Sequence, residues 1–178
     1  MTALWALLGV ALVLLALWLV STANRLDRMH HRIDVARGRL DTQLLRRSSI
    51  TLELAASDAL DPASRVVLLD AAHRARSSPP DDLEQEESAL SQALRAVVGK
   101  ADDLAALRRD PGVGPLVEEL ARACARVELS RRFHNDAVVS ARALRSRRLV
   151  RWFRLAGRAA ELHTVDLDDV PPGGLAEG

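Results

Sequence analysis

The sequence predicts an all-α protein in which an N-terminal transmembrane helix precedes an antiparallel four-helix bundle with long helices. Three observations predict this fold class. Residues 2–23 contain no charged side chain. Apolar residues then recur every three or four positions, which is the spacing of a helix face. Turn-forming residues at Asp61-Pro62, 77–82 and Asp110-Pro111-Gly112 divide the remaining chain into helix-length pieces.

The first segment, residues 1–23, is predicted to be a transmembrane anchor. Its 22 uncharged residues, TALWALLGVALVLLALWLVSTA, would span about 33 Å as a helix, enough to cross a hydrocarbon core of about 30 Å. Trp5 and Trp18 lie toward its two ends, where indole rings suit the membrane interfaces. A cleaved signal peptide is the alternative, because Ser21-Thr22-Ala23 resembles a cleavage site. The long apolar run without a preceding basic residue favours the uncleaved anchor.

Charged residues beside the anchor predict its orientation. Five arginines follow the apolar run at positions 25, 28, 32, 37 and 39. Because an excess of arginine marks the cytoplasmic side of a membrane, the N-terminus is expected outside and the remaining chain in the cytoplasm, at the plasma membrane. The single cysteine, Cys124, agrees with a reducing compartment.

Residues 24–158 are predicted to form the cytoplasmic bundle. The expected second helix, 62–76, presents Val66, Leu69 and His73 on one face. Ser78 is the expected N-cap of the third helix, whose first turns carry acidic residues that we expect to be solvated. The expected buried positions of the first, third and fourth helices are, in chain order, Leu26, Met29, Ile33, Ala36, Leu40, Leu44, Ile50 and Leu54; Leu83, Leu90, Leu94, Val97, Ala101 and Leu104; and Leu120, Cys124, Val127, Ala137, Ala141 and Leu144.

The fourth helix is expected to begin near Pro115 and to continue to about Ala156. Its last part, residues 145–158, reads RSRRLVRWFRLAGR and carries six arginines. Basic and apolar residues fall on different faces of this helix, a pattern typical of helices at a membrane surface. The residues expected to contact the anionic inner leaflet are Arg147, Arg148, Arg151, Trp152, Phe153, Arg154 and Arg158.

Two other interpretations of this basic segment remain open. Trp152 and Phe153 could complete the bundle core while the arginines are solvated. Alternatively, the arginines could bind nucleic acid at the membrane. We regard nucleic acid as the less favoured partner because the rest of the domain is near neutral or acidic. Residues 159–178 are acidic and rich in proline and glycine, so a disordered tail is expected there.

Two segments together resemble the LemA family. The first, residues 24–47, is similar to the opening helix of the family at Asn24, Leu26, Asp34, Asp41, Gln43, Leu44, Arg46 and Arg47. The second, residues 126–138, is similar to a motif in its last helix at Arg131, Asn135, Asp136 and Val138. The chain resembles a divergent member, because Arg37 and His134 stand where the family often has aromatic residues. The resemblance implies a single span, an outside N-terminus and a cytoplasmic four-helix bundle, but no activity.

No set of residues in the sequence predicts catalysis. The five histidines do not form a metal-binding spacing, and no second cysteine accompanies Cys124, which we expect to be a small buried side chain. Arg46, Arg47 and Asp41 are candidates for ion pairs within the bundle. We therefore expect no enzyme activity, cofactor, metal or small-molecule substrate. The expected function is that of a scaffold or adaptor at the inner membrane surface, whose partners are the lipid bilayer and an unidentified protein or a second copy of the chain.

Overall fold

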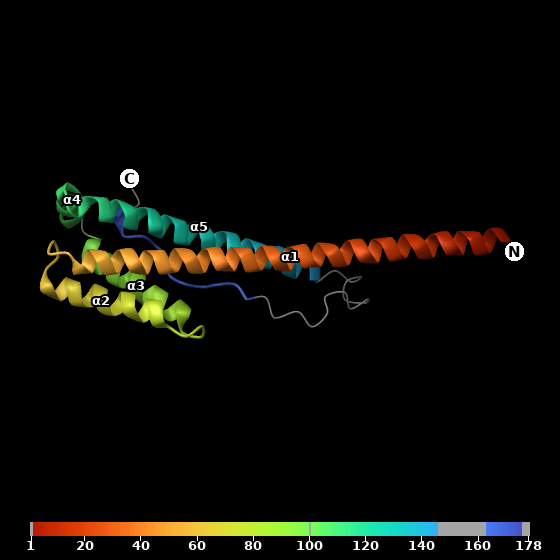
Figure 1. Ribbon diagram of the computed structural model, residues 1–178, viewed down its shortest axis with the longest axis horizontal. Coiled ribbons are helices and arrows are strands. Elements are labelled where there is room, and N and C mark those ends of the chain that lie inside the picture. The colour runs from red at the N-terminus through yellow and green to blue at the C-terminus, as the bar shows by residue number, and fades with distance from the viewer. Residues whose placement is uncertain (1, 100, 146–162, 176–178) are drawn as a thin grey trace. The chain divides into compact units, whose positions relative to one another are not determined.

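The protein is all-helical over the residues that the computed structural model describes, which are 2–99, 101–145 and 163–175. No strand is present in these ranges, so the predicted all-α class is confirmed there. The helices are α1 (Thr2–Ala56), α2 (Pro62–Ser77), α3 (Leu83–Val98), α4 (Ala101–Arg109) and α5 (Gly114–Arg145), and Gly173–Leu175 forms a single 3₁₀ turn, η1 (Figure 1).

Helix α1 combines the predicted anchor and the predicted first bundle helix in 55 continuous residues. No proline interrupts it, and good helix formers stand on both sides of the expected boundary at residue 23, among them Leu19, Ala23 and Arg25. The helix ends at Ala56, ahead of Asp61-Pro62. Asp61 then caps α2, because its Oδ1 accepts hydrogen bonds from the backbone N–H groups of Ala63 and Ser64 at 3.0 and 3.1 Å.

The chain forms two compact units, each with its own buried residues. The first unit contains Met1–Ala36 and His134–Thr164, and the second contains Arg37–Phe133 and Val165–Gly178. In the first unit, Ile33 packs with Val138 and Ala141. The second unit holds the main core, which contains residues of all five helices. Helix α1 contributes only its C-terminal part to this core, and α5 contributes only its N-terminal part.

Leucine, valine and alanine side chains fill the core of the second unit. Helices α2 and α3 lie side by side within it (Figure 1). The core residues, by element, are Ile50, Leu54 and Ala55 of α1; Leu68, Ala71, Ala72 and Ala75 of α2; Leu90, Leu94 and Val98 of α3; Leu104 and Leu107 of α4; Val117, Leu120, Ala123 and Cys124 of α5; and Leu175 of η1.

Of the three residues predicted to share one face of α2, Leu69 packs against the core, whereas the prediction is wrong for Val66 and His73. Val66 is 66% exposed and His73 is also exposed, whereas Leu68 and three alanines face the core. The small alanine side chains allow neighbouring helices to approach closely, so burial follows the alanine face rather than the bulkier Val66. Ser78 ends α2 instead of capping α3: its Oγ donates to the Ala75 carbonyl at 3.1 Å.

The predicted third helix is divided into α3 and α4. Gly99 ends α3, and its N–H donates to the Arg95 carbonyl oxygen at 3.0 Å. A Cβ atom at Gly99 would lie 2.1 Å from the same oxygen, so the backbone approach requires glycine. The nine residues of α4 therefore form a separate short helix before α5.

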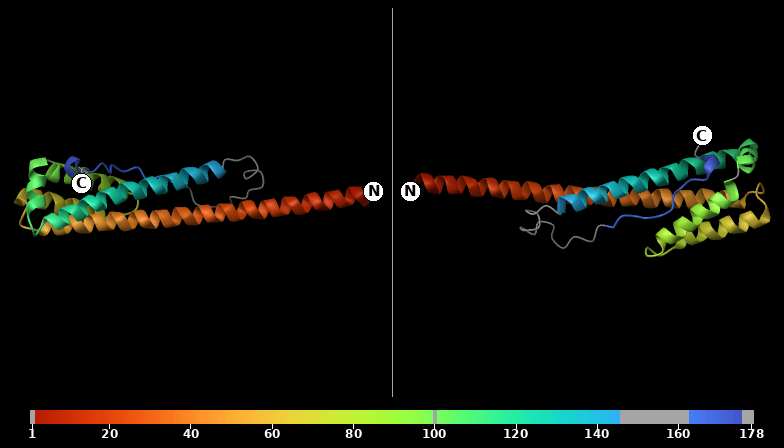
Figure 2. Two further views of the ribbon diagram at one scale, coloured as in Figure 1. Left: turned by 90° about the horizontal axis from the view of Figure 1, so that it is seen from above. Right: turned by 180° about the vertical axis from the view of Figure 1, so that it is seen from behind.

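The C-terminal residues also differ from the prediction of a disordered tail over 159–178. Residues 163–175 are ordered, and Val165, Leu167 and Leu175 are at most 5% exposed. We refer to residues 165–175 as the C-terminal segment. Figure 2 shows it in blue as an extended stretch beside the helices that ends in η1. The acidic and proline-rich composition predicts disorder. The segment is nevertheless packed, because its few apolar side chains contact buried apolar residues of the helices.

Candidate functional site

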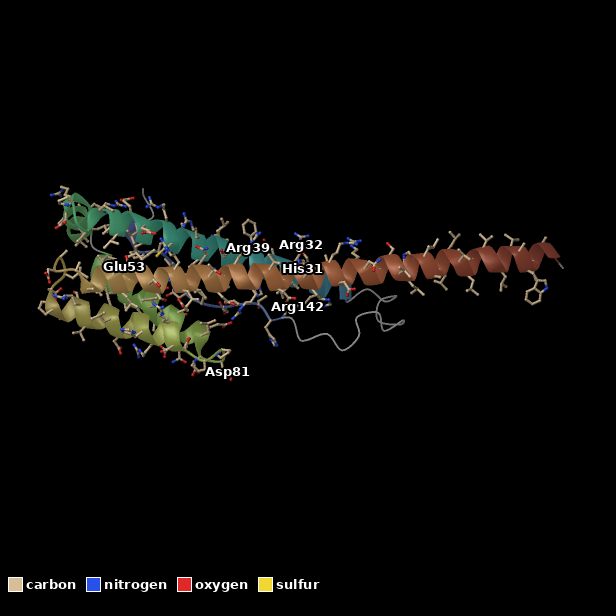
Figure 3. All side chains as sticks on the ribbon, in the orientation of Figure 1. His31, Arg32, Arg39, Glu53, Asp81 and Arg142 are labelled. Carbon is tan, nitrogen blue, oxygen red and sulfur yellow. The ribbon has the colours of Figure 1, made fainter. Side chains whose placement is uncertain are left out.

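Three features of the structure could carry function: an exposed apolar helix, a buried ion pair and the docking site of the C-terminal segment. The apolar helix is the N-terminal part of α1, which is long and apolar enough to cross a membrane. Its side chains are exposed, including Trp5 at 70% and Leu12 at 63%. Figure 3 shows that this stretch presents mostly carbon atoms, while charged side chains accompany the helix further along, including the labelled Arg32 and Arg39.

The buried ion pair joins Arg47 of α1 to Glu87 of α3. Arg47 is 1% exposed, and its Nη2 donates to Glu87 Oε2 at 2.6 Å and to the Glu87 carbonyl oxygen at 3.1 Å. Its Nη1 donates to Ser91 Oγ at 3.0 Å. Glu87 was expected among solvated acidic residues, and this expectation is wrong. Glu87 lies on the same face of α3 as Leu90 and Leu94, which brings it into the core.

Burial controls the ionisation of the groups around this pair. It raises the pKa of Glu87, and the adjacent Arg47 guanidinium offsets only part of that shift. Burial likewise raises the pKa of the Cys124 thiol, again partly offset by Arg47. Cys124 is 2% exposed, which confirms the prediction of a small buried side chain. A buried thiol with a raised pKa is a poor nucleophile.

The arrangement of Arg47, Glu87 and Ser91 supports a structural role. The guanidinium links α1 to α3 through both the side chain and the backbone of Glu87. Arg47 Nε has no hydrogen-bond partner among the described residues. Removing two charges from water is costly, so such a pair defines which helix surfaces meet more than it adds stability.

The third feature is the docking site of the C-terminal segment on the second unit. Alternate residues of the segment, Val165, Leu167 and Asp169, are buried. This is the side-chain alternation of an extended chain. Val165 and Leu167 pack with three buried residues of α1 and α5, which are Leu40, Leu44 and Val127.

Two arginine–aspartate pairs hold the C-terminal segment against the helices. Arg95 of α3 binds Asp168 through both terminal nitrogens, with Nη1–Oδ1 at 3.0 Å, and also donates to the Val170 carbonyl at 2.7 Å. Arg131 of α5 binds Asp169 through Nε at 2.6 Å and Nη2 at 3.0 Å. Bidentate pairs of this kind are among the stronger and more directional hydrogen bonds in proteins.

The ionisation of the segment follows from these pairs. The hydrogen bond from Arg95 lowers the pKa of Asp168, against the opposing effect of burial. The hydrogen bond to Asp169 similarly raises the pKa of Arg131. The sequence signal for this docking was the alternation in Val165-Asp-Leu167-Asp-Asp169. Composition alone predicted disorder and concealed that period of two.

The residues that resemble the LemA motifs have different environments. Arg47 forms the buried pair with Glu87, and Arg131 binds Asp169 of the C-terminal segment. Arg46 forms an ion pair with Glu119 of α5. Leu44 and Val138 are buried. Ion pairs of Arg46 and Arg47 were predicted and are confirmed. Asp41 pairs with Arg37 one turn away at 3.1 Å, on the surface. The remaining motif residues include exposed Asn24, Asp34 and Asp136, half-buried Gln43 and Asn135, and Leu26 in α1.

Other predicted residues do not converge on a reaction centre. His134 is buried, and its Nε2 lies 3.2 Å from the His163 carbonyl oxygen, whereas its neighbour Asp136 is exposed. Within the part of the chain that the structure describes, no group of three or more potential metal ligands is arranged around one point. The predicted membrane contacts, Arg147, Arg148, Arg151, Trp152, Phe153, Arg154 and Arg158, lie outside the described residues.

A surface cleft of about 500 Å³ lies at the end of the second unit where α1 and α2 are connected. Leu60, Val97 and Leu107 provide its apolar lining, and Asp61 and Asp110 provide its carboxylates. Both carboxylates accept backbone N–H groups of their own turns, Asp110 from Gly112 at 2.8 Å. These hydrogen bonds identify both aspartates as turn-forming residues.

Comparison with known proteins does not add a family or an activity. No protein-family model matches the chain, no curated protein is significantly similar to it, and no solved structure matches its fold. The features described above are therefore the basis for a functional proposal.

Proposed function

We propose that this protein is a membrane-anchored scaffold or adaptor whose helical domain lies at the cytoplasmic surface of the plasma membrane. The observation that carries the proposal is the continuity of α1. One unbroken helix has an exposed apolar N-terminal part and a C-terminal part that contributes Ile50, Leu54 and Ala55 to a packed core. A protein built in this way would hold its helical domain at a fixed membrane surface.

The proposed orientation rests on the arginines that follow the apolar part of α1. Arg25, Arg28 and Arg32 lie within the next turns of the same helix. The positive-inside rule then supports an outside N-terminus and a cytoplasmic second unit. Anionic lipids of the inner leaflet would attract the basic residues that flank the span and those of the segment 145–158.

The finer fold belongs to the same proposal. We propose that α1, α2, α3 and α5 form an antiparallel four-helix bundle of the LemA type, with α4 as part of a connection. Supporting this arrangement, residues of all four long helices share one core in the second unit, and the connections α1–α2 and α2–α3 are short. The matching positions Leu44, Arg47 and Arg131 all have structural contacts in this unit.

Thiol labelling on the two sides of the membrane tests the orientation. Gln92 is exposed, so Gln92→Cys in a Cys124→Ala background provides a label site on the second unit. A membrane-impermeant maleimide is expected to modify this cysteine in inverted vesicles and not in intact cells. Thr2→Cys is the matched control with the opposite expected pattern. Labelling of Gln92→Cys in intact cells would contradict the proposed orientation.

Crosslinking in native membranes, followed by mass spectrometry, tests the scaffold function. We expect crosslinks from the helical surface to a reproducible protein partner or to a second copy. A variant whose apolar segment is replaced by an unrelated transmembrane helix should retain those crosslinks, because the domain supplies the binding surface. Loss of every specific crosslink in both proteins would contradict a scaffold or adaptor.

A further inference from the structure

The docking site of the C-terminal segment has the properties of a peptide-binding groove. We infer that this groove on α1, α3 and α5 accepts the C-terminal segment of a second copy as well as its own, so that two copies become linked by exchange of residues 165–175. The inference goes beyond the proposed function and does not depend on which side of the membrane the domain lies.

The groove recognises an extended chain through its side-chain alternation. Two apolar residues two positions apart, Val165 and Leu167, enter the cluster formed by Leu40, Leu44 and Val127. Asp169, two positions further along, is 7% exposed and continues the same face. An apolar–apolar–acidic series with this period therefore matches the groove, whereas a helical peptide would present a different spacing.

Charge complementarity defines the ligand further. The groove provides Arg95 and Arg131 from two different helices, and the segment provides the adjacent carboxylates of Asp168 and Asp169. Each arginine binds with two nitrogens, which fixes both position and direction of the bound chain. The preferred ligand is thus an extended acidic–apolar segment, and the chain carries one such segment in residues 165–170.

The manner of attachment resembles that of a bound peptide. The backbone of residues 168–170 is held by side chains of the helices: Ser88 Oγ accepts the Asp168 N–H at 3.0 Å, and Arg95 donates to the Val170 carbonyl oxygen at 2.7 Å. The helices make their backbone hydrogen bonds within themselves, so these bonds do not require the segment. Its departure would leave the backbone hydrogen bonds of the helices in place, although it would also take Leu175 out of the shared core.

A second copy offers an identical segment. In the sequence, 19 residues, 146–164, separate Arg145 from the C-terminal segment. At about 3.3–3.6 Å per residue, a connection of this length can reach at most roughly 60–70 Å. Exchange would reproduce the same apolar contacts and ion pairs, so its equilibrium depends on the concentration of neighbouring copies rather than on new contacts.

Disulfide trapping in the full chain tests exchange between copies. Ser88→Cys is placed in one tagged copy and Asp168→Cys in a second copy with a different tag, both carrying Cys124→Ala. The Asp168 N–H lies 3.0 Å from Ser88 Oγ, so the two positions are neighbours when the segment is bound. Asp168→Cys removes the carboxylate that Arg95 binds, but it leaves the pair of Arg131 with Asp169 and the contacts of Val165 and Leu167 in place. We expect a disulfide-linked pair of differently tagged copies after co-expression. Its yield should be at least ten-fold above that with Asp58→Cys, whose side chain is 99% exposed, in place of Asp168→Cys.

Both cysteines in a single copy report whether the variants keep the native docking. Formation of this internal disulfide, together with no tagged pair above the Asp58→Cys control, would overturn exchange. Failure of the internal disulfide to form would overturn the groove itself. Neither result would affect the proposed membrane orientation, which the separate thiol labelling of Gln92→Cys measures.

Charge exchange tests the specificity of the groove. Arg131→Glu in the copy that carries Ser88→Cys should reduce the yield of linked copies about ten-fold. Asp169→Arg in the copy that carries Asp168→Cys should restore it, because the opposite charges are then interchanged between groove and segment. A yield that does not respond to either substitution would show that the linkage arises from random collision and would overturn the inference.

Discussion

The two ends of α1 reverse the usual relation between polarity and burial. Leu12, in the apolar N-terminal part, is 63% exposed, whereas Arg47, in the C-terminal part of the same helix, is 1% exposed. Both parts have the same secondary structure, because α1 is one continuous helix from Thr2 to Ala56. Burial therefore depends on which surface a helix face meets, rather than on the polarity of each side chain alone.

The comparison also shows what each part needs from its surroundings. In the proposed arrangement, the hydrocarbon core of the bilayer removes the exposed side chains of the apolar part from water. The charged group in the core instead needs a partner within the protein, and Glu87 supplies it at 2.6 Å. Substitutions at Arg47 and Leu12, each with a control residue on an exposed surface, therefore test the two parts of α1 separately.

The largest effect is expected at the buried pair. Arg47→Met should lower the free energy of unfolding by about 3–5 kcal/mol, because Glu87 would remain buried without its partner. Denaturant unfolding of the full chain in detergent, followed by circular dichroism, measures this change. A loss below about 1 kcal/mol would show that water or another group replaces the guanidinium.

The matched control removes both partners of the buried pair. Arg47→Met combined with Glu87→Leu should recover most of the stability lost in the single variant, and replacement of buried pairs by apolar residues has stabilised other proteins by roughly 1–4 kcal/mol. If the double variant is as unstable as the single one, Arg47 contributes through packing that the pair does not explain.

An arginine in the apolar part of α1 is expected to have the next largest effect. Leu12→Arg should raise the free energy of membrane insertion by about 3 kcal/mol, because the guanidinium would lie near the middle of the proposed span. The measurement is the fraction of protein that stays in the membrane after alkaline extraction. Leu129→Arg is the control, since Leu129 is 52% exposed on α5 and should tolerate the charge. Equal retention of both variants would contradict a membrane span.

Loss of one clamp should loosen the C-terminal segment. Arg131→Gln removes the bidentate pair with Asp169 and should favour local opening by about 1.5–3 kcal/mol, the usual contribution of hydrogen bonds to charged groups. Faster hydrogen exchange of the Asp168 amide reports the opening. Arg132→Gln is the neighbouring control, because Arg132 pairs with Glu128 on an exposed part of the same helix. Similar exchange in both variants would contradict the clamp.

Acid should remove the contribution of Asp168. Its pKa is lowered from the ordinary value of 3.8 by the hydrogen bond with Arg95, so the ionised form stabilises the folded state. The contribution is complete above pH 3.8 and is lost as pH falls through the lowered pKa. The stability difference between the native chain and Asp168→Asn should therefore be constant above pH 3.8 and decrease below it. A difference that grows on acidification would have the wrong sign.

The smallest effect is expected at the surface pair of Arg37 and Asp41. Their side chains are 38% and 46% exposed, so water screens the attraction across one helical turn. Asp41→Asn should change the free energy of unfolding by less than about 0.5 kcal/mol in the same denaturant measurement. A larger loss would assign Asp41 a contact beyond Arg37 and would weaken the distinction between surface and buried pairs.

Helical periodicity predicted more of this protein than composition did. Leu40, Leu44, Leu90, Leu94 and Leu120 were expected in the core and are buried. Long leucine-rich faces repeat the helical period several times, which makes their direction clear. On α2 the pattern was short, and the bulky Val66 proved less important than three alanines that permit close packing.

The candidate sites were predicted less completely than the helices. Arg46 and Arg47 were expected to form ion pairs, but their partners Glu119 and Glu87 lie far away in sequence. Asp168 and Asp169 belonged to a segment expected to be disordered. Local sequence carries no direct information about such distant pairs, because any arginine can meet any carboxylate that the fold brings to it.

Side-chain chemistry repeated at a fixed local period is enough to predict the helical class, the uncharged apolar stretch and the main apolar faces. Packing between distant segments was needed to bring Glu87 out of solvent to Arg47, to bury the alanine face of α2, and to dock residues 165–175 as a largely extended chain. Each of these three outcomes requires that the shape and charge of two surfaces far apart in the sequence match one another.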